Sequence, residues 1–251
     1  AAPDGRVVTA SDDEAVKVWR DGACERTIQA RTDRPLLAVA VLPGGARFVS
    51  GSLDGTAKLW TLDGALERTF ELGSRVMCVA ALPDGVHVVI GVGGPFDVGP
   101  GNNEVRLYHI DGTFVYAFKG QRVPDRYDDG GAPIDYDEAW VPDPNGGHTD
   151  NVRALAVTPD GQHIISGSRD NLVKVWSVAS KSLVSTCAGH DGWILAVAAM
   201  PDGQRILSGS DDKTVRVWLL DGTLKNTFRL HDLQLHANAL VALPDNQHAL
   251  A

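Results

Sequence analysis

A short Pro-Asp-Gly motif, or a close variant of it, recurs along the chain and restricts its fold more than any other feature. Neighbouring copies lie 40, 40, 76, 42 and 43 residues apart. A repeat of about this length is typical of arrays in which one supersecondary unit recurs and buries its apolar faces on its neighbours. The sequence therefore predicts one repeat domain over residues 1–251. The prolines of the motif are Pro3, Pro43, Pro83, Pro159, Pro201 and Pro244.

Each repeat contains the same parts in the same order. A short apolar stretch precedes the motif, and a β-rich stretch that ends in Ser-Gly-Ser follows it, as at 50–52. Next comes a run of alternating side chains that ends in an aromatic residue, as at Trp60, and this alternation indicates strands. An Asp-Gly pair then predicts a two-residue hairpin turn, because both of its residues tolerate a positive φ. The pair begins at Asp21, Asp63, Asp111 and Asp221.

Two repeats, over 147–176 and 189–218, carry a longer pattern of Gly-His, Ser-Gly-Ser, Asp and Val-Lys-Val-Trp or Val-Arg-Val-Trp. On this pattern the chain resembles the WD-repeat (WD40) family over nearly its whole length. The resemblance implies an all-β propeller of four-stranded antiparallel blades, of which five can be counted here. It also implies one hydrogen-bonded structural network inside each of these two repeats. The residues concerned are His148, Ser166, Asp170 and Trp176, and His190, Ser208, Asp212 and Trp218.

The Ser, His and Asp of these repeats also have the composition of a hydrolase triad. A catalytic set should occur once, at one cleft, whereas this set occurs twice at equivalent positions. The structural interpretation is therefore preferred, because a buried indole, hydroxyl, imidazole and carboxylate satisfy one another. The second repeat has Thr32 in place of the histidine. The third repeat has Leu72, Ile90, Asn102 and Tyr108, and so lacks the whole set.

The aromatic residue that closes the third strand of each repeat departs from the family pattern, because Asp never follows it. The following residues are Arg20, Thr61, His109, Ser177 and Leu219.

Both ends of the chain fall inside a repeat. The predicted strands at 6–10 and 247–251 both occupy the second position of a blade. In WD-repeat rings the two termini usually share one blade, so a strand at 240–243 is expected to complete the sheet that contains Trp19. One strand is then left over. Either the chain forms a five-bladed ring with an extra tail, or it is part of a longer chain with a seven-bladed ring, and the second alternative is favoured.

The interval of 76 residues contains two insertions, within 93–101 and over 121–147, and the resemblance places both on one face of the propeller. The larger insertion joins the third and fourth blades, has a net charge of −5 and contains Tyr127, Tyr136 and Trp140. Loops on a rigid scaffold commonly carry function, and an acidic-aromatic composition suits a basic partner. The alternative is a variable loop that binds nothing.

The same face carries the positions at which the family usually contacts its partners, at the start of each first strand and just before the network Asp. A Trp beside Leu and Arg has the composition of an interface hot spot, unless Trp193 folds back over its own blade. The candidate partner-binding residues are Trp193, Leu195, Arg153, Asn151, Arg169, Asp211, Arg75, Met77, Tyr127, Tyr136 and Trp140, with His236, Asn238, Asp12 and Leu53 as further positions.

Composition excludes several classes of function. The formal net charge of −9 argues against nucleic acid or membrane as a partner, because both attract a local surplus of Lys and Arg. Three widely spaced cysteines and the lack of a visible targeting segment favour a cytoplasmic or intracellular location. No residue spacing suggests zinc, calcium or a phosphate loop, so no metal and no cofactor are expected.

These observations predict a non-catalytic protein–protein interaction scaffold. It is expected to bind proteins or peptides, basic ones among them, on the face with the two insertions, and no small-molecule substrate is expected. One alternative is a targeting or regulatory propeller within a larger multidomain protein. A less favoured alternative is a propeller enzyme or small-ligand binder. The step from propeller to scaffold rests on the resemblance and not on the fold alone.

Overall fold

The computed structural model describes residues 2–94, 103–118, 146–230, 239–242 and 249–250, and all regular structure within them is β-strand. The strands form one three-stranded, four four-stranded and one two-stranded sheet. Every pair of neighbouring strands is antiparallel, as in the register Phe48↔Trp60. No helix of the described residues is long and apolar enough to cross a membrane. The prediction of propeller blades of four antiparallel strands is confirmed.

We number the five larger sheets as blades 1 to 5 in chain order. Blade 1 contains β1 (Val7–Ala10), β2 (Ala15–Arg20) and β3 (Ala23–Gln29). Blade 2 contains β4 (Leu36–Val41), β5 (Arg47–Ser52), β6 (Thr56–Thr61) and β7 (Leu66–Glu71). Blade 3 contains β8 (Arg75–Ala81), β9 (His87–Gly93), β10 (Val105–His109) and β11 (Phe114–Phe118). Blade 4 contains β12 (Val152–Val157), β13 (His163–Ser168), β14 (Val173–Ser177) and β15 (Ser182–Cys187). Blade 5 contains β16 (Ile194–Ala199), β17 (Arg205–Ser210), β18 (Thr214–Leu219) and β19 (Leu224–Arg229).

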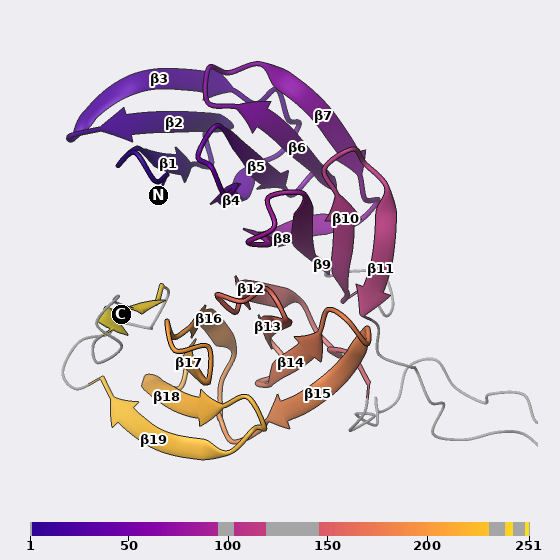
Figure 1. Cartoon of the computed structure of the whole chain (residues 1–251), viewed down its shortest axis with the longest axis vertical. Coiled ribbons are helices and arrows are strands. Elements are labelled where there is room, and N and C mark those ends of the chain that lie inside the picture. Colours follow the sequence, from indigo (N-terminus) through magenta and orange to yellow (C-terminus); the bar gives the residue numbers. More distant parts are fainter. Residues whose placement is uncertain (1, 95–102, 119–145, 231–238, 243–248, 251) are drawn as a thin grey trace, which may run out of the picture.

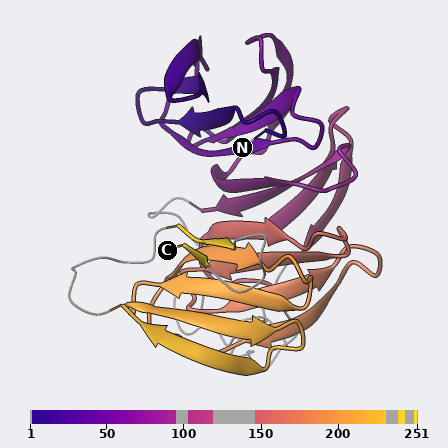
Figure 2. The same cartoon turned by 60° about the vertical axis from the view of Figure 1, so that its left-hand side comes forward.

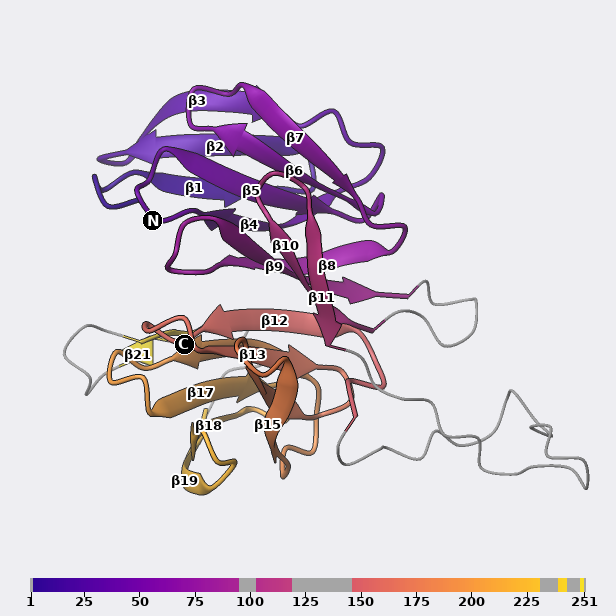
Figure 3. The ribbon, with the colours of Figure 1, turned by 45° about the vertical axis from the view of Figure 1, so that its right-hand side comes forward.

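The blades lie side by side around a central space, with the first strand of each four-stranded blade innermost and the last strand outermost (Figure 1). The inner strands β4, β8, β12 and β16 contact one another in this order. Neighbouring sheets stack face to face (Figure 3). The described sheets form an open arc and not a closed ring (Figure 1).

The strand expected at 240–243 does not complete blade 1. β20 (Val241–Ala242) pairs with β21 (Ala249–Leu250) in a small sheet of its own, and blade 1 has three strands. This sheet lies beside blade 5, where β20 contacts β16 (Figure 2). The expectation was wrong because β21 offers β20 a pairing partner close by in the sequence.

The Pro-Asp-Gly motif, or its variant, forms the turn between the first two strands of each four-stranded blade. In blade 3 the amide N–H of Gly85 donates to the carbonyl oxygen of Leu82, 3.1 Å away. Pro83 therefore occupies the second turn position, where its fixed φ fits, and Gly85 has a φ of +71°. Asp84 accepts hydrogen bonds from two amides beyond the turn, so every residue of the motif has a structural role.

The Asp-Gly pair forms the predicted two-residue turn only in blade 1, where Asp21 and Gly22 have φ angles of 49° and 80°. In blade 2 the N–H of Gly64 instead donates to the carbonyl of Thr61, so the pair fills the last two positions of a four-residue turn. The turns at Gly112 and Gly222 are built in the same way. The prediction is wrong for these three hairpins.

The glycine of the Ser-Gly-Ser stretch in blades 2 and 4 leaves room for the next blade. A Cβ on Gly51 of β5 would collide with Val76 of β8, and one on Gly167 of β13 would collide with Ile194 of β16. Apolar clusters consequently span the blade boundaries. One cluster joins Phe70 of blade 2 to Ile90 of blade 3.

A comparison of blades 2 and 5 shows how strongly cover by a neighbouring sheet affects the burial of a side chain. Phe70 and Phe228 occupy equivalent positions, because they pair with the second residue of the third strand, Ala57 and Val215. Phe70, which blade 3 covers, is 4% exposed, whereas Phe228 is 53% exposed. Among the described residues no further four-stranded sheet follows blade 5 to cover this position.

We expect Phe70→Ala to lower the free energy of unfolding by about 3–5 kcal/mol, since it leaves a cavity between two sheets. Phe228→Ala should cost only about 0.5 kcal/mol, because its ring is already half in water. Urea denaturation of the two variants measures both values. Equal losses would show that contact between blades is not what makes this position important.

Candidate functional site

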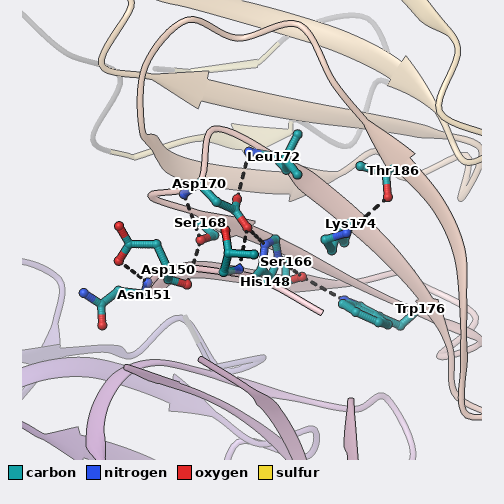
Figure 4. Close-up of polar contacts among 11 residues, drawn as sticks. His148, Asp150, Asn151, Ser166, Ser168, Asp170, Leu172, Lys174, Trp176 and Thr186 are labelled. Atoms are coloured by element: carbon teal, nitrogen blue, oxygen red, sulfur yellow. Dashed lines mark hydrogen bonds and ion pairs between the residues drawn. The ribbon is translucent and has the colours of Figure 1, made fainter. Parts of the chain in front are cut away.

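The four network residues of blade 4 form one chain of hydrogen bonds from strand to loop (Figure 4). The indole Nε1–H of Trp176 donates to Ser166 Oγ at 2.8 Å, and Ser166 Oγ lies 2.7 Å from His148 Nε2. His148 Nδ1 lies 2.8 Å from an Asp170 carboxylate oxygen. These contacts connect β14, β13 and the segments that precede β12 and β14.

Blade 5 repeats this arrangement. Trp218 donates to Ser208 Oγ at 2.8 Å, and His190 lies 2.7 Å from both Ser208 and Asp212. An ionised carboxylate can only accept, so Nδ1–H donates to Asp212, and in a neutral imidazole Nε2 then accepts the proton of the serine hydroxyl, whose oxygen accepts the indole proton. This assignment requires a neutral imidazole.

The ionisation of the network in blade 5 agrees with this assignment. Burial lowers the pKa of His190, although the hydrogen bond and charge of Asp212 act in the opposite direction. Burial acts to raise the pKa of Asp212, but hydrogen bonds from Thr214 and His190 outweigh it and hold the value at about 2. At neutral pH the pair therefore consists of a neutral imidazole and a carboxylate.

The distances within the network match those of a hydrolase triad, but its accessibility does not. Ser166 and Ser208 are both 0% exposed, and each already accepts an indole proton. A nucleophile must reach its substrate. In blades 4 and 5 the hydroxyls are sealed between strands, so these contacts tie each blade together.

The other blades keep only parts of the network. Trp60 of blade 2 donates to Ser50 Oγ at 3.0 Å, while Thr32, in place of the histidine, is buried and its hydroxyl has no partner among the described residues. Blade 3 has aromatic packing instead, since the Tyr108 ring lies 5.7 Å from that of Phe70 in an edge-to-face arrangement.

The second serine of Ser-Gly-Ser positions the loop that leads into the inner strand. Ser168 Oγ donates to the carbonyl of Asp150 at 2.9 Å, and Ser210 Oγ donates to that of Gly192 at 2.9 Å. The amide of Arg169 donates to the carbonyl of Asn151, and that of Asp211 to the carbonyl of Trp193. The polar framework therefore holds the residues at the start of β12 and β16.

Each inner strand of blades 2 to 5 has a bulge at the residue after its first buried side chain. The pairing register shifts between Leu36 and Ala38, and the other three inner strands shift at the equivalent place. A bulge releases a residue from the alternation of the sheet and redirects its side chain. The four released residues are Leu37, Met77, Arg153 and Leu195, and they line one central cavity.

This cavity has a volume of about 400 Å³ and lies among the inner strands. The side chains that line it, among them Val39, Val79 and Leu155, are apolar except for Arg153 and the thiol of Cys78. We call the end of the cavity where the inner strands begin the channel mouth. A pocket of mostly apolar side chains with one polar group is typical of a binding site.

Trp193 stands at the channel mouth and is 45% exposed. It does not fold back on its own blade alone, because the guanidinium carbon of Arg169 in blade 4 lies 4.3 Å from its ring centroid. A cation over an indole face is attractive and holds the ring in place. The mouth therefore presents a large aromatic surface in a fixed orientation.

Of the predicted contact residues, Met77, Arg153 and Leu195 line the cavity. Arg75, Met77, Arg153 and Leu195 are half-buried around the cavity or its mouth, Asp211 is exposed and Asn151 is buried. Leu37 was missed, although it occupies the same repeat position as Met77. Tyr127, Tyr136, Trp140, His236 and Asn238, and nearly all of the two insertions, lie outside the described residues.

A repeated four-stranded blade with an inner-strand bulge and a Trp-Ser-His-Asp network defines a propeller-type repeat protein. Comparison with protein families gives the same result, because three segments match the WD domain, G-beta repeat: 22–61, 145–177 and 181–218. Three segments of the chain are therefore WD repeats, which confirms the resemblance seen in its sequence. Proteins with these repeats bind other proteins.

Two relatives are informative. Pre-mRNA-processing factor 17 of Saccharomyces cerevisiae is 26% identical over 174 residues, which cover 68% of this chain and 31% of the relative. The ribosome biogenesis protein BOP1 homologue of Drosophila grimshawi is 48% identical over 40 residues, which cover 16% of this chain and 5% of the relative. The chain thus spans less than a third of either relative.

The predicted cytoplasmic location is wrong. The two relatives are named for pre-mRNA processing and for ribosome biogenesis, which are nuclear processes. All three cysteines are free, as expected for a reducing compartment, but a nucleus is as reducing as a cytoplasm. Cysteine content therefore cannot separate the two.

We expect His190→Gln to lower the free energy of unfolding at neutral pH by about 1–3 kcal/mol, because buried partners lose their hydrogen bonds. The pH dependence of the free energy of unfolding provides a second test. The folded state lowers the pKa of His190 below 6.5, so the stability that this residue contributes is complete above that value and declines as the pH falls below it.

Urea denaturation between about pH 7.5 and pH 5.5 should therefore show a smaller loss of stability in His190→Gln than in the unchanged protein. Lys225→Gln, on the exposed outer strand of blade 5, is the control and should keep the full loss, because it removes no imidazole. If the free energy of unfolding of His190→Gln falls with pH as steeply as that of the unchanged protein, His190 is not a buried, neutral imidazole.

Proposed function

We propose that this chain is a non-catalytic scaffold that binds a partner protein at the channel mouth, with Trp193 as the main anchor. The observation that supports this most directly is the exposed indole itself. The Trp residues that close β6, β14 and β18 are at most 4% exposed, whereas Trp193 is 45% exposed and is oriented by Arg169. Trp and Arg in a pocket are the residue types that dominate interface energies.

The blade framework suits this role, because it holds the mouth residues without help from a partner. Pre-organised contact residues cost less entropy on binding. The buried serines of blades 4 and 5 are unsuited to nucleophilic chemistry, which supports a non-catalytic function. Among the described residues no group of three His, Cys, Asp or Glu side chains is arranged to hold a metal ion.

We further infer from the names of the two relatives that the partner belongs to an RNA-processing or ribosome-assembly complex. The net charge of −9 favours a protein component of such a complex over its nucleic acid. The acidic insertion 121–147 is proposed to add a second contact, with a basic surface of the same or another partner.

Affinity capture from a cell extract, followed by mass spectrometry, tests this proposal. We expect Trp193→Ala to lose most of the partners that the intact chain captures, and deletion of 121–147 to lose those that need the insertion. Phe114→Ala is the matched control, since Phe114 is 53% exposed at the hairpin on the opposite end of blade 3. Circular dichroism should show that all variants fold.

Retention of every partner in both variants would place the binding surface elsewhere. Loss of the partners in Phe114→Ala but not in Trp193→Ala would assign the opposite face of the propeller.

A further inference from the structure

The bulge residues around the channel mouth differ in one chemical respect. Leu37, Met77 and Leu195 are apolar, whereas Arg153 places a cation in the same ring. The guanidinium is half-buried, and no carboxylate of the described residues forms an ion pair with it. A cation that is partly removed from water and lacks a counter-charge attracts an anion.

Two features around Arg153 strengthen its attraction for an anion. Burial, and then the nearby positive charge of Arg169, lower the pKa of Arg153. Both effects mean that the folded protein holds the charge of Arg153 at a cost. An anionic group from outside would offset that cost, because no carboxylate of the described residues is paired with Arg153 before binding.

We propose that the channel mouth binds an extended segment of a partner protein in which an Asp or Glu stands beside a large apolar side chain. The carboxylate pairs with Arg153, and the apolar side chain enters the ring of Leu37, Met77 and Leu195. This inference rests on the proposed function, since it specifies the kind of segment that the scaffold binds.

Arg153 is the one cation in the cavity lining, with Arg169 close by but outside that lining, and the side chains around Arg153 are apolar, which favours a carboxylate over more highly charged anions. Arg presents a planar fork that matches a carboxylate in two parallel hydrogen bonds. A phosphate or a nucleic-acid backbone carries more charge and is usually met by several cations on a polar surface. Here the cavity lining supplies one cation and is otherwise apolar, apart from the thiol of Cys78.

Selection from a displayed library of random 12-residue peptides on the intact chain tests the proposal. The selected peptides should be enriched in Asp or Glu next to Leu, Ile, Met or Phe. One selected peptide is then synthesised, and its affinity is measured by calorimetry. Arg153→Met should weaken its binding about tenfold or more, and so should Asp→Asn or Glu→Gln in the peptide.

Two further variants control this measurement. Arg26→Met removes an exposed arginine from the outer strand of blade 1, and it should leave the affinity unchanged. Arg153→Lys keeps the charge without the planar fork, so its affinity should lie between those of the intact chain and Arg153→Met. If Arg153→Met does not fold, a value for Arg153→Lys equal to that of the intact chain overturns the proposal.

The outcomes separate this inference from the proposed function. Neutral or basic peptides whose binding needs Trp193 but not Arg153 would overturn the acidic segment and leave the scaffold in place. A library that yields no peptide, or only peptides insensitive to both Trp193→Ala and Arg153→Met, would overturn both.

Discussion

Contact between neighbouring sheets is the interaction on which the rest of this structure depends. A four-stranded sheet leaves two faces in water unless another sheet covers them, and here each boundary between complete blades is closed by a shared apolar cluster. The Ser-Gly-Ser stretch makes this contact possible. Its glycine admits the next inner strand, its first serine binds the buried indole in the same sheet, and its second serine holds the loop that leads into the blade.

The candidate site follows from this arrangement. Because Ser168 and Ser210 hold the loops that precede β12 and β16, Arg153 and Trp193 start from fixed backbone positions. Contact between blades then brings residues from separate repeats to one opening, and Arg169 reaches over Trp193 from the neighbouring blade. Arg169 and Trp193 belong to different repeats, so the site is formed by neighbouring blades together and not by any one blade.

The sequence predicted the blades well, because alternation, turn residues and the network motif are local signals that recur. The same locality explains the errors. Asp-Gly was assigned one turn type throughout, although two residues separate Trp60 from Asp63 and only one separates Trp19 from Asp21. That spacing distinguishes the turns. Leu37 was missed although the repeat indicated it, since it occupies the position of Met77, Arg153 and Leu195, which were predicted. The pairing of β20 depended on a choice between distant partners.

The inner-strand bulge has a consequence for how such a chain can change. Residues 37, 77, 153 and 195 take no part in the alternation that builds the sheets, and Leu, Met, Arg and Leu occupy these positions in otherwise similar strands. Each of blades 2 to 5 thus has one position where the side chain meets the channel, although Met77 also packs on the apolar cluster between blades 3 and 4. Substitutions there can alter what the channel recognises while the propeller framework stays intact, so recognition and folding are encoded by different residues of the same strand.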